Sequence, residues 1–392
     1  MSARDIGRRL ERAAVPDAEG AERRARVVVE TAFAAASPTA RPRPRGGDRH
    51  APLIAALALA LAVVAVVATL TPPGAAVAGW VKRTLGVEVA KPQRVALGPL
   101  PGGGRLLVTG TRGTWIVARD GSRTRLGSYT GATWSPRGLF VGAWRGPRLS
   151  AVAPDGRVAW SYGTLGDVRD VRWSPDGYRI AYRSGSRLAL VAGNGRGARV
   201  LDASPRGATP AWRPTEPHTL AWARADGRVV IRDVDSGRTV WRSPSGHGTA
   251  RELLWSADGR RLLSLEANVV RVLDLRARRQ WRVAVPRGRR LRAAAWAPRG
   301  RRLALVVRER RGMSSVVVAS GARRSLAGRR IFVTPGTLDA VAWSPDGRRL
   351  LVRAPRADQW LFLPASGRGR ATAVTPVARH FGGTPGLAGW CC

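Results

Sequence analysis

The apolar positions of the chain follow different patterns before and after about residue 93. Beyond that point, short apolar runs alternate with turns rich in Pro, Asp and Gly. Such runs are typical of β-strands. They follow one another in residues 178–182 and 187–190, and again in residues 261–265 and 269–273. Residues 93–392 are therefore predicted to form an all-β domain of short antiparallel strands.

A short motif recurs among these strands at a regular spacing. Trp-Ser-Pro-Asp-Gly occurs at residues 173–177 and again at residues 343–347, with close variants that begin at three other tryptophans and a degenerate copy at a fourth. These six tryptophans are Trp134, Trp173, Trp212, Trp255, Trp296 and Trp343, which are 39, 39, 43, 41 and 47 residues apart. Four short strands in each repeat of about 40 residues indicate a β-propeller blade.

Each residue type in the motif has a structural explanation. Proline fixes φ at the first central position of a turn, the Asp side chain bonds the backbone, and Gly adopts a conformation that is costly for other residues. We therefore interpret Asp176, Asp258 and Asp346 as turn formers and not as calcium ligands. The repeated tryptophan is interpreted as a structural wedge between neighbouring blades, where a large ring buries the most area.

The blade count depends on both ends of the repeat region. A degenerate copy begins near Leu97, which replaces the tryptophan 37 residues before Trp134. This copy raises the count to seven blades, although six blades or an eighth partial blade remain open. Residues 387–390 (Leu-Ala-Gly-Trp) resemble the strand that leads into the tryptophan of each motif. We expect this C-terminal strand to be the innermost strand of the first blade, which closes the ring and removes the exposed sheet edges.

The motif, the strand after it and the later Asp-x-x-Ser-Gly turn resemble the TolB-type, WD-repeat-like propeller repeat (PD-repeat) over residues 93–392. The Gly-His and Trp-Asp signatures of the eukaryotic WD repeat are missing. The whole organisation is similar to membrane-anchored propeller proteins of GC-rich actinobacteria. This resemblance implies a seven-bladed β-propeller outside the cytoplasm.

The N-terminal part divides into four segments. Residues 1–36 have a weak helical pattern, and residues 37–50 form a Pro- and Arg-rich linker. Residues 51–71 are predicted to form a transmembrane helix because residues 51–70 carry no charge and span about 30 Å as a helix. Residues 72–92 are a membrane-proximal connector.

The charges beside the apolar segment predict its orientation. Arg41, Arg43, Arg45 and Arg49 precede it closely, whereas Lys82 lies well beyond it. The positive-inside rule therefore places the N-terminus in the cytoplasm and the propeller outside, in a single-pass membrane protein. The alternative is a cleaved signal peptide, since residues 76–78 (Ala-Val-Ala) resemble a cleavage site. We favour an uncleaved signal anchor.

The formal net charge of +41 raises nucleic acid as a partner. However, 67 residues are Lys or Arg and only Lys82 and Lys91 are lysine, so arginines number 67 − 2 = 65. They are spread over every repeat and do not cluster in one stretch. This bias is typical of a GC-rich genome, and we interpret it as a solvated basic surface. Nucleic acid is therefore not an expected partner.

The repeats contain no recognisable catalytic, metal or cofactor motif. A Gly-x-Ser-x-Gly elbow is absent, and so is any lysine after Lys91, which excludes a phosphate loop of the Gly-Lys type in the repeats. The four histidines form no metal-like cluster, and the two cysteines, Cys391 and Cys392, are the last residues. We interpret these as free terminal thiols, although a strained vicinal disulfide or a bond to another molecule is possible. We expect that the protein is not an enzyme and that it binds no metal or cofactor, and we assign no catalytic residue.

Binding then remains as the function, at one propeller face or the central channel. Candidate residues near that mouth are Asp170, Arg172, Glu252 and Asp339, each of which is also explained as an ordinary solvated side chain. The first hypothesis is a monomeric, non-catalytic scaffold or sensor that binds an unknown protein or cell-envelope ligand. One alternative is an anti-sigma-factor-like regulator whose residues 1–36 bind a cytoplasmic protein. The other is a propeller enzyme that acts on glycans, which the scattered histidines disfavour.

Overall fold

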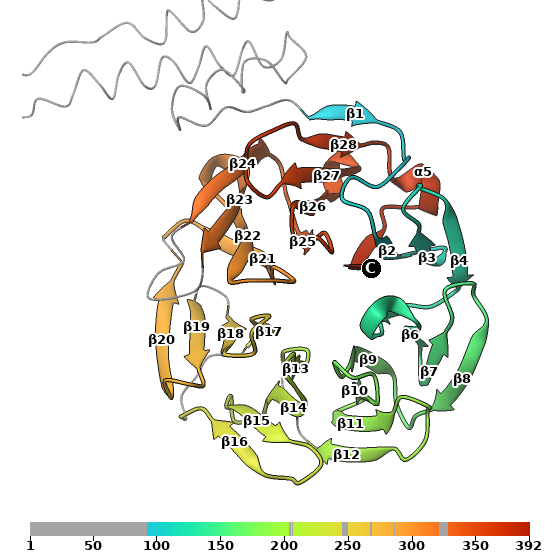
Figure 1. The fold of residues 1–392 in the computed structure, drawn as a ribbon, viewed down its shortest axis with the longest axis vertical. Coiled ribbons are helices and arrows are strands. Elements are labelled where there is room, and N and C mark those ends of the chain that lie inside the picture. The colour runs from blue at the N-terminus through green and yellow to red at the C-terminus, as the bar shows by residue number, and fades with distance from the viewer. Residues whose placement is uncertain are drawn as a thin grey trace, which may run out of the picture. The chain divides into compact units, whose positions relative to one another are not determined.

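The computed structural model describes residues 92–203, 205, 207–244, 250–266, 269–285, 287–320 and 328–392. These residues form seven β-sheets around a common axis (Figure 1). The predicted all-β, seven-bladed β-propeller is therefore confirmed. The segments predicted for residues 1–36, 37–50 and 51–71 lie outside the described residues, as does the connector 72–92 except for its last residue. Within the described part of the chain, no helix is long and apolar enough to cross a membrane.

The first four blades each contain four strands, named here from the ring axis outward. Blade 1 comprises β29 (Gly386–Cys391), β2 (Arg105–Gly110), β3 (Gly113–Val117) and β4 (Arg123–Gly127). Blade 2 comprises β5 (Gly131–Trp134), β6 (Val141–Arg145), β7 (Arg148–Val152) and β8 (Val158–Gly163). Blade 3 comprises β9 (Val168–Trp173), β10 (Arg179–Ser184), β11 (Arg187–Ala192) and β12 (Arg199–Asp202). Blade 4 comprises β13 (Ala211–Arg213), β14 (Glu216–Ala223), β15 (Val229–Asp233) and β16 (Thr239–Arg242).

The other three blades follow the same plan, and the last has a fifth strand. Blade 5 comprises β17 (Glu252–Trp255), β18 (Arg261–Leu265), β19 (Val269–Asp274) and β20 (Arg279–Ala284). Blade 6 comprises β21 (Arg290–Trp296), β22 (Arg302–Arg308), β23 (Met313–Ser320) and β24 (Arg329–Pro335). Blade 7 comprises β25 (Ala340–Trp343), β26 (Arg349–Ala354), β27 (Gln359–Pro364), β28 (Thr372–Val374) and β1 (Gln93–Val95). The described helices are the 3₁₀ turns η1 (Pro136–Gly138), η2 (Arg310–Gly312) and η3 (Pro355–Ala357), and α5 (Ala378–Phe381).

Both ends of the domain close the ring. The C-terminal β29 pairs antiparallel with β2 as the innermost strand of blade 1, which confirms the expected closure. The N-terminal β1 pairs parallel with β28 on the outer edge of blade 7. The assignment of Leu97 to the first tryptophan position is wrong. Trp390 occupies that position, because it pairs with Leu106 just as Trp173 pairs with Ile180.

The tryptophans of the inner strands lie between blades, as predicted. Four of them donate an indole hydrogen bond to the inner strand of the preceding blade, and each acceptor directly precedes that blade's own tryptophan. The pairs are Trp212 to Arg172 O (3.0 Å), Trp255 to Ala211 O (3.0 Å), Trp296 to Leu254 O (3.2 Å) and Trp343 to Ala295 O (2.8 Å). Each ring therefore joins adjacent blades by packing and by a directional bond.

The Asp-Gly turns are closed by their own side chains, which confirms their role as turn formers. In the last copy, Ser344 Oγ donates to Asp346 Oδ1 at 2.5 Å, and the Arg348 amide donates to the same oxygen at 2.9 Å. Burial opposes ionisation of Asp346, but these hydrogen bonds and neighbouring arginine charges outweigh it and hold the pKa of Asp346 below its ordinary value. Gly347 has a φ of 69°, which favours glycine at this position.

Candidate functional site

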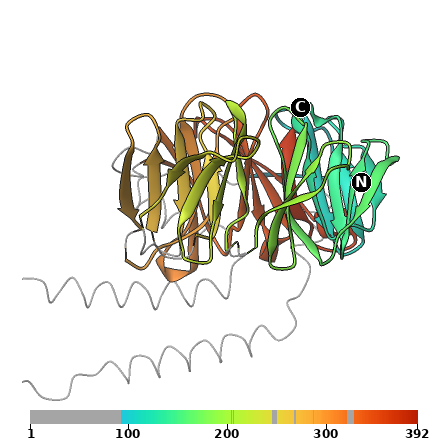
Figure 2. The ribbon, with the colours of Figure 1, turned by 90° about the horizontal axis from the view of Figure 1, so that it is seen from below.

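The antiparallel strand order places the connections of every blade on two opposite faces (Figure 2). We name the face that carries the loops before each inner strand, and the turns between second and third strands, the front face. The opposite face, with the Trp-Ser-Pro-Asp-Gly turns, is the back face. The inner strand of each blade has one partner strand, so its other edge faces the ring axis (Figure 1).

A cluster of polar residues lies at the front ends of three successive inner strands. Asp170, Thr209 and Glu252 each stand three residues before the tryptophan of their blade. Thr209 Oγ1 donates to Asp170 Oδ1 at 2.8 Å, and Thr209 forms a parallel bridge with Glu252. The equivalent positions of the other four blades carry no polar side chain: Gly131, Ala293, Ala340 and Leu387. The polar side chains at this position therefore occupy one arc of the ring.

Arg172 adds a positive charge to this arc. Desolvation by the surrounding protein lowers the pKa of Arg172, although the carboxylates of Glu252 and Asp170 favour its charged form. Its side chain nevertheless keeps exposed surface, as expected beside the ring axis. Burial raises the pKa of Glu252 against the opposing influence of Arg172 and Arg251. Both charges are thus partly desolvated, and a polar ligand at this arc would interact with them strongly.

Asp170 is held in an unusual backbone conformation. Its φ is 56°, in the left-handed region, at a bulge where the register between β9 and β10 shifts. Its second carboxylate oxygen lies 3.5 Å from Arg183 Nη1, and that nitrogen also donates to Gly207 O at 3.1 Å. The bulge and these bonds aim the carboxylate at the neighbouring blade. Asp170 therefore links blades 3 and 4 as well as contributing charge to the arc.

The structure brings three of the four sequence candidates together and separates the fourth. Asp170, Arg172 and Glu252 interact electrostatically. Asp339 instead lies on blade 7, where Arg353 donates two hydrogen bonds to it, at 2.8 and 2.5 Å. Asp339 is therefore explained as one half of an ion pair within its own blade. Among the described residues, no three His, Cys, Asp or Glu side chains are grouped to hold a metal ion.

The front face has two hollows that the sequence did not indicate. One, of about 420 Å³, lies between blades 2 and 3 beside Tyr162 and Tyr182, whose rings make an edge-to-face contact at 6.4 Å. Leu165, in the loop before β9, lines this hollow and is 96% exposed. Burial and the adjacent Tyr162 raise the pKa of Tyr182, so its hydroxyl stays protonated at neutral pH. The sequence feature that could have indicated this hollow is the apolar Leu165 in a short loop.

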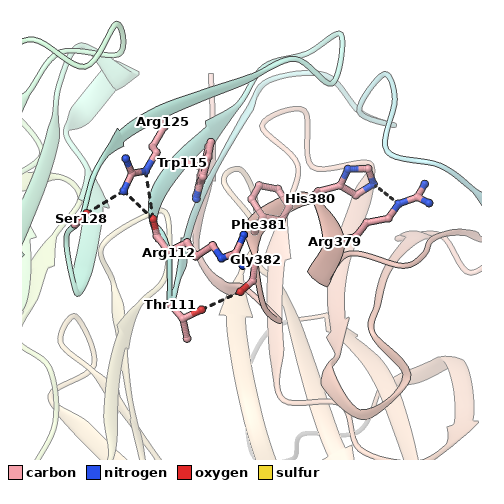
Figure 3. Close-up of a pocket in the computed structure, with 9 residues that line it drawn as sticks. All are labelled: Thr111, Arg112, Trp115, Arg125, Ser128, Arg379, His380, Phe381 and Gly382. Carbon is pink, nitrogen blue, oxygen red and sulfur yellow. Dashed lines mark hydrogen bonds between the residues drawn. The ribbon is translucent and has the colours of Figure 1, made fainter.

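The second hollow, of about 440 Å³, lies where blade 7 meets blade 1. We name it the seam pocket (Figure 3). Its lining comes from the turn between β2 and β3, the end of β4, and α5 with the following glycine: Thr111, Arg112, Trp115, Arg125, Ser128, Arg379, His380, Phe381 and Gly382. No motif marks it, because it exists only once distant segments of the chain meet.

The expectation of two free C-terminal thiols is wrong. Cys391 and Cys392 form a vicinal disulfide. Strand β29 ends at Cys391, and Cys392 adopts a φ of 35°, which brings the adjacent side chains together.

Comparison with known proteins concerns the architecture. No protein-family model and no curated protein matches the sequence. A chain of a mitotic checkpoint complex crystal structure is similar, with a TM-score of 0.53, 16% identity, and coverage of 70% of this chain and 92% of that one. The β-propeller domain of Cps50 (Swd1) from Myceliophteria thermophila gives a TM-score of 0.53 at 15% identity, over 68% of this chain and 97% of that one.

This chain shares the β-propeller fold of the Cps50 domain. Hydrazine synthase from Kuenenia stuttgartiensis is also similar, with a TM-score of 0.49, 16% identity, and coverage of 61% of this chain and 77% of that one. At such identities the likeness concerns the fold alone.

Proposed function

We propose that the protein is a membrane-anchored, extracytoplasmic β-propeller that serves as a non-catalytic binding scaffold or sensor. The observation that carries this proposal is the gathering of unusual features on one face. The polar arc and both described hollows lie on the front face, whereas the back face carries turns whose polar groups bond one another. A propeller with charged groups and hollows on one face is suited to binding a partner at that face. Similarity to a chain from a multiprotein complex supports a protein as the partner.

The absence of catalysis is proposed from how the acidic groups are engaged. Asp170 accepts a hydrogen bond from Thr209 and faces Arg183, and Asp339 is bound by Arg353. Asp170 is thus bound to the neighbouring blade and Asp339 is paired within its own blade, so both are poorly suited to proton transfer.

The proposed location rests on the uncharged residues 51–70 and the arginines before them. We expect protease added to intact cells to remove an epitope tag at the C-terminus and to leave a tag at the N-terminus intact, since only the propeller would be accessible. Lysed cells, in which both tags should be digested, are the control. Protection of the C-terminal tag in intact cells would contradict the proposed location.

Two exposed leucines allow a matched test of the binding face. Leu165 is 96% exposed on the front face, and Leu139 is 62% exposed in a back-face turn. We expect Leu165→Asp to reduce the retention of partner proteins from solubilised cell envelopes by about tenfold, because a buried charge at an interface centre is costly. Leu139→Asp should bind like the wild type. Equal retention by both variants, or loss only with Leu139→Asp, would reject the front face.

A further inference from the structure

The seam pocket unites parts of the chain that are far apart in sequence. Arg123 Nη1 of β4 donates to the carbonyl of His380 in α5 at 2.5 Å, and Thr111 Oγ1 donates to Gly382 O at 3.1 Å. These pairs are separated by 257 and 271 residues. One wall of the pocket therefore belongs to blade 1, and the other to the segment that leads into the closing strand β29 (Figure 3).

The charged side chains that line the pocket are all basic. Arg112, Arg125 and Arg379 line it together with His380, and no acidic residue does. Among the described residues, none of these three arginines forms an ion pair with a carboxylate. This distinguishes them from arginines such as Arg353 and Arg261, which are paired with aspartates. In so arginine-rich a chain, a single exposed arginine signifies little, but three that line one hollow form a site for an anion.

The binding groups are partly fixed in advance. Arg125 donates through Nε and Nη2 to Arg112 O at 3.2 and 3.0 Å, and through Nη2 to Ser128 Oγ at 2.9 Å. Its guanidinium carbon also lies 5.9 Å from the centre of the Trp115 ring, which contacts Phe381 edge to face at 6.1 Å. No described residue accepts from Arg125 Nη1. The guanidinium is therefore held rigidly with one end unbonded, which reduces the entropy cost of binding an anion.

Arg112 lies in the turn between β2 and β3, on the same wall as Arg125, and reaches toward the opposite segment. No hydrogen-bond acceptor for its guanidinium is found among the described residues, and its side chain lies directly over Gly382, where an added Cβ would fall 2.0 Å from Arg112 Cδ. Gly382 also has a φ of 71°. Glycine at this position thus leaves room for the Arg112 side chain and ends α5.

We propose that the seam pocket binds a phosphoryl or sulfuryl group of a small molecule through Arg112, Arg125 and Arg379, and that its occupancy strengthens closure of the ring. Tetrahedral anions with several oxygens match several guanidinium groups around one hollow, and the hydroxyl of Ser128, which accepts from Arg125, keeps its own proton to donate. The pocket volume falls within the range of small-molecule sites. A ligand that contacts both walls binds only the closed ring and stabilises it by linkage. This inference does not depend on the proposed location or on a protein partner.

His380 gives the site a pH dependence. Burial lowers the pKa of His380, Arg123 on β4 and Arg379 on α5 lower it further, and Asp358, after η3, partly offsets them. Arg112 and Arg125 line the same hollow. His380 is therefore neutral at pH 7 and becomes protonated below the ordinary histidine pKa of about 6.5. A bound anion favours the protonated form, so affinity for sulfate, whose own charge does not change in this pH range, should rise as the pH falls below that value.

The test is calorimetric titration of the full-length protein with inorganic phosphate, inorganic sulfate and glucose 6-phosphate. We expect saturable binding that Arg112→Gln and Arg379→Gln each weaken at least tenfold. Both side chains are exposed, so these variants should fold normally. Arg299→Gln is the matched control, because it removes the same charge from an exposed turn of blade 6 and should bind like the wild type.

Closure is tested by hydrogen exchange in β29. Phosphate should slow exchange at residues 386–391 in the wild type and in Arg299→Gln, but not in Arg112→Gln. Equal weakening of affinity in all three variants would reject a specific site in favour of general charge attraction. Absence of saturable binding, or binding only to vesicles that contain phosphatidic acid, would overturn the assignment to a small molecule. Binding without protection of β29 would overturn the coupling to closure.

Discussion

Deletion of residues 386–392 is expected to abolish the cooperative folding of the propeller. This change removes the inner strand of blade 1 and leaves β2 with one unpaired edge. Leu106, Leu107 and Val108 of β2 are fully buried and would lose their β29 neighbours. The deletion also removes Trp390, whose ring contacts Phe362 of blade 7 at 5.6 Å. Domains are stable by only about 5–15 kcal/mol, and the loss of this strand is of comparable size.

Urea unfolding followed by near-ultraviolet circular dichroism measures this effect. The deleted protein should lack a cooperative transition. Deletion of Cys391 and Cys392 alone is the control, because it removes the disulfide but retains Trp390 and most of the strand. That shorter deletion should keep a cooperative transition. A sharp transition in the longer deletion would show that the ring does not need β29.

Substitution of Trp343 by alanine should destabilise the propeller by about 3–5 kcal/mol. Trp343 is buried in a cluster shared by blades 6 and 7, and its indole donates to Ala295 O at 2.8 Å. The Arg302 guanidinium lies 4.9 Å from the centre of its ring. The substitution therefore creates a cavity between two blades and leaves a carbonyl without its donor.

The free energy of unfolding from urea titration checks this prediction. Trp343→Phe keeps a ring and loses the indole donor, so its cost should be intermediate. Tyr178→Ala is the control for an aromatic residue at the surface, because Tyr178 is 74% exposed and its loss should cost less than about 0.5 kcal/mol. Similar losses for Trp343→Ala and Tyr178→Ala would contradict the wedge role of the tryptophan.

The architecture could be predicted because the repeat uses the same residues for the same local tasks. Trp173 and Trp343 mark inner strands, and Asp176 and Asp346 close turns through contacts a few residues away. Periodicity then yields the blade count. Leu97 was wrongly assigned to the tryptophan position of the first blade because its spacing from Trp134 fits the repeat, whereas the strand pairing places another residue there. A strand from the other end of the domain supplies the tryptophan of blade 1, and only the pairing of Trp390 with Leu106 reveals which residue belongs there.

The candidate site could be predicted only in part. Asp170, Arg172 and Glu252 were recognisable as polar residues near the front ends of inner strands, but their electrostatic coupling depends on the relative placement of blades 3 and 5. The separation of Asp339 from them depends on the same placement. β1 was not foreseen as a fifth strand of blade 7, since three residues carry no distinctive pattern.

The seam pocket was beyond sequence reasoning for a related reason. Arg112 and Arg379 are two among many arginines, and nothing in their local sequence sets them apart. They line one pocket because chain segments more than 250 residues apart meet there. The hydrogen bond from Thr111 to Gly382 joins these segments. Convergence of this kind is a property of the closed ring.

The position of β29 also governs the order of events during synthesis. Trp390 and the Gly103 carbonyl that accepts its hydrogen bond are 287 residues apart, so the first blade to emerge from the ribosome is the last to be completed. Throughout translation, β2 presents an unsatisfied edge to other nascent chains, and such edges promote aggregation. A chain that is released before β29 has been made leaves the ring open. The first blade therefore stays incomplete until β29 has been synthesised.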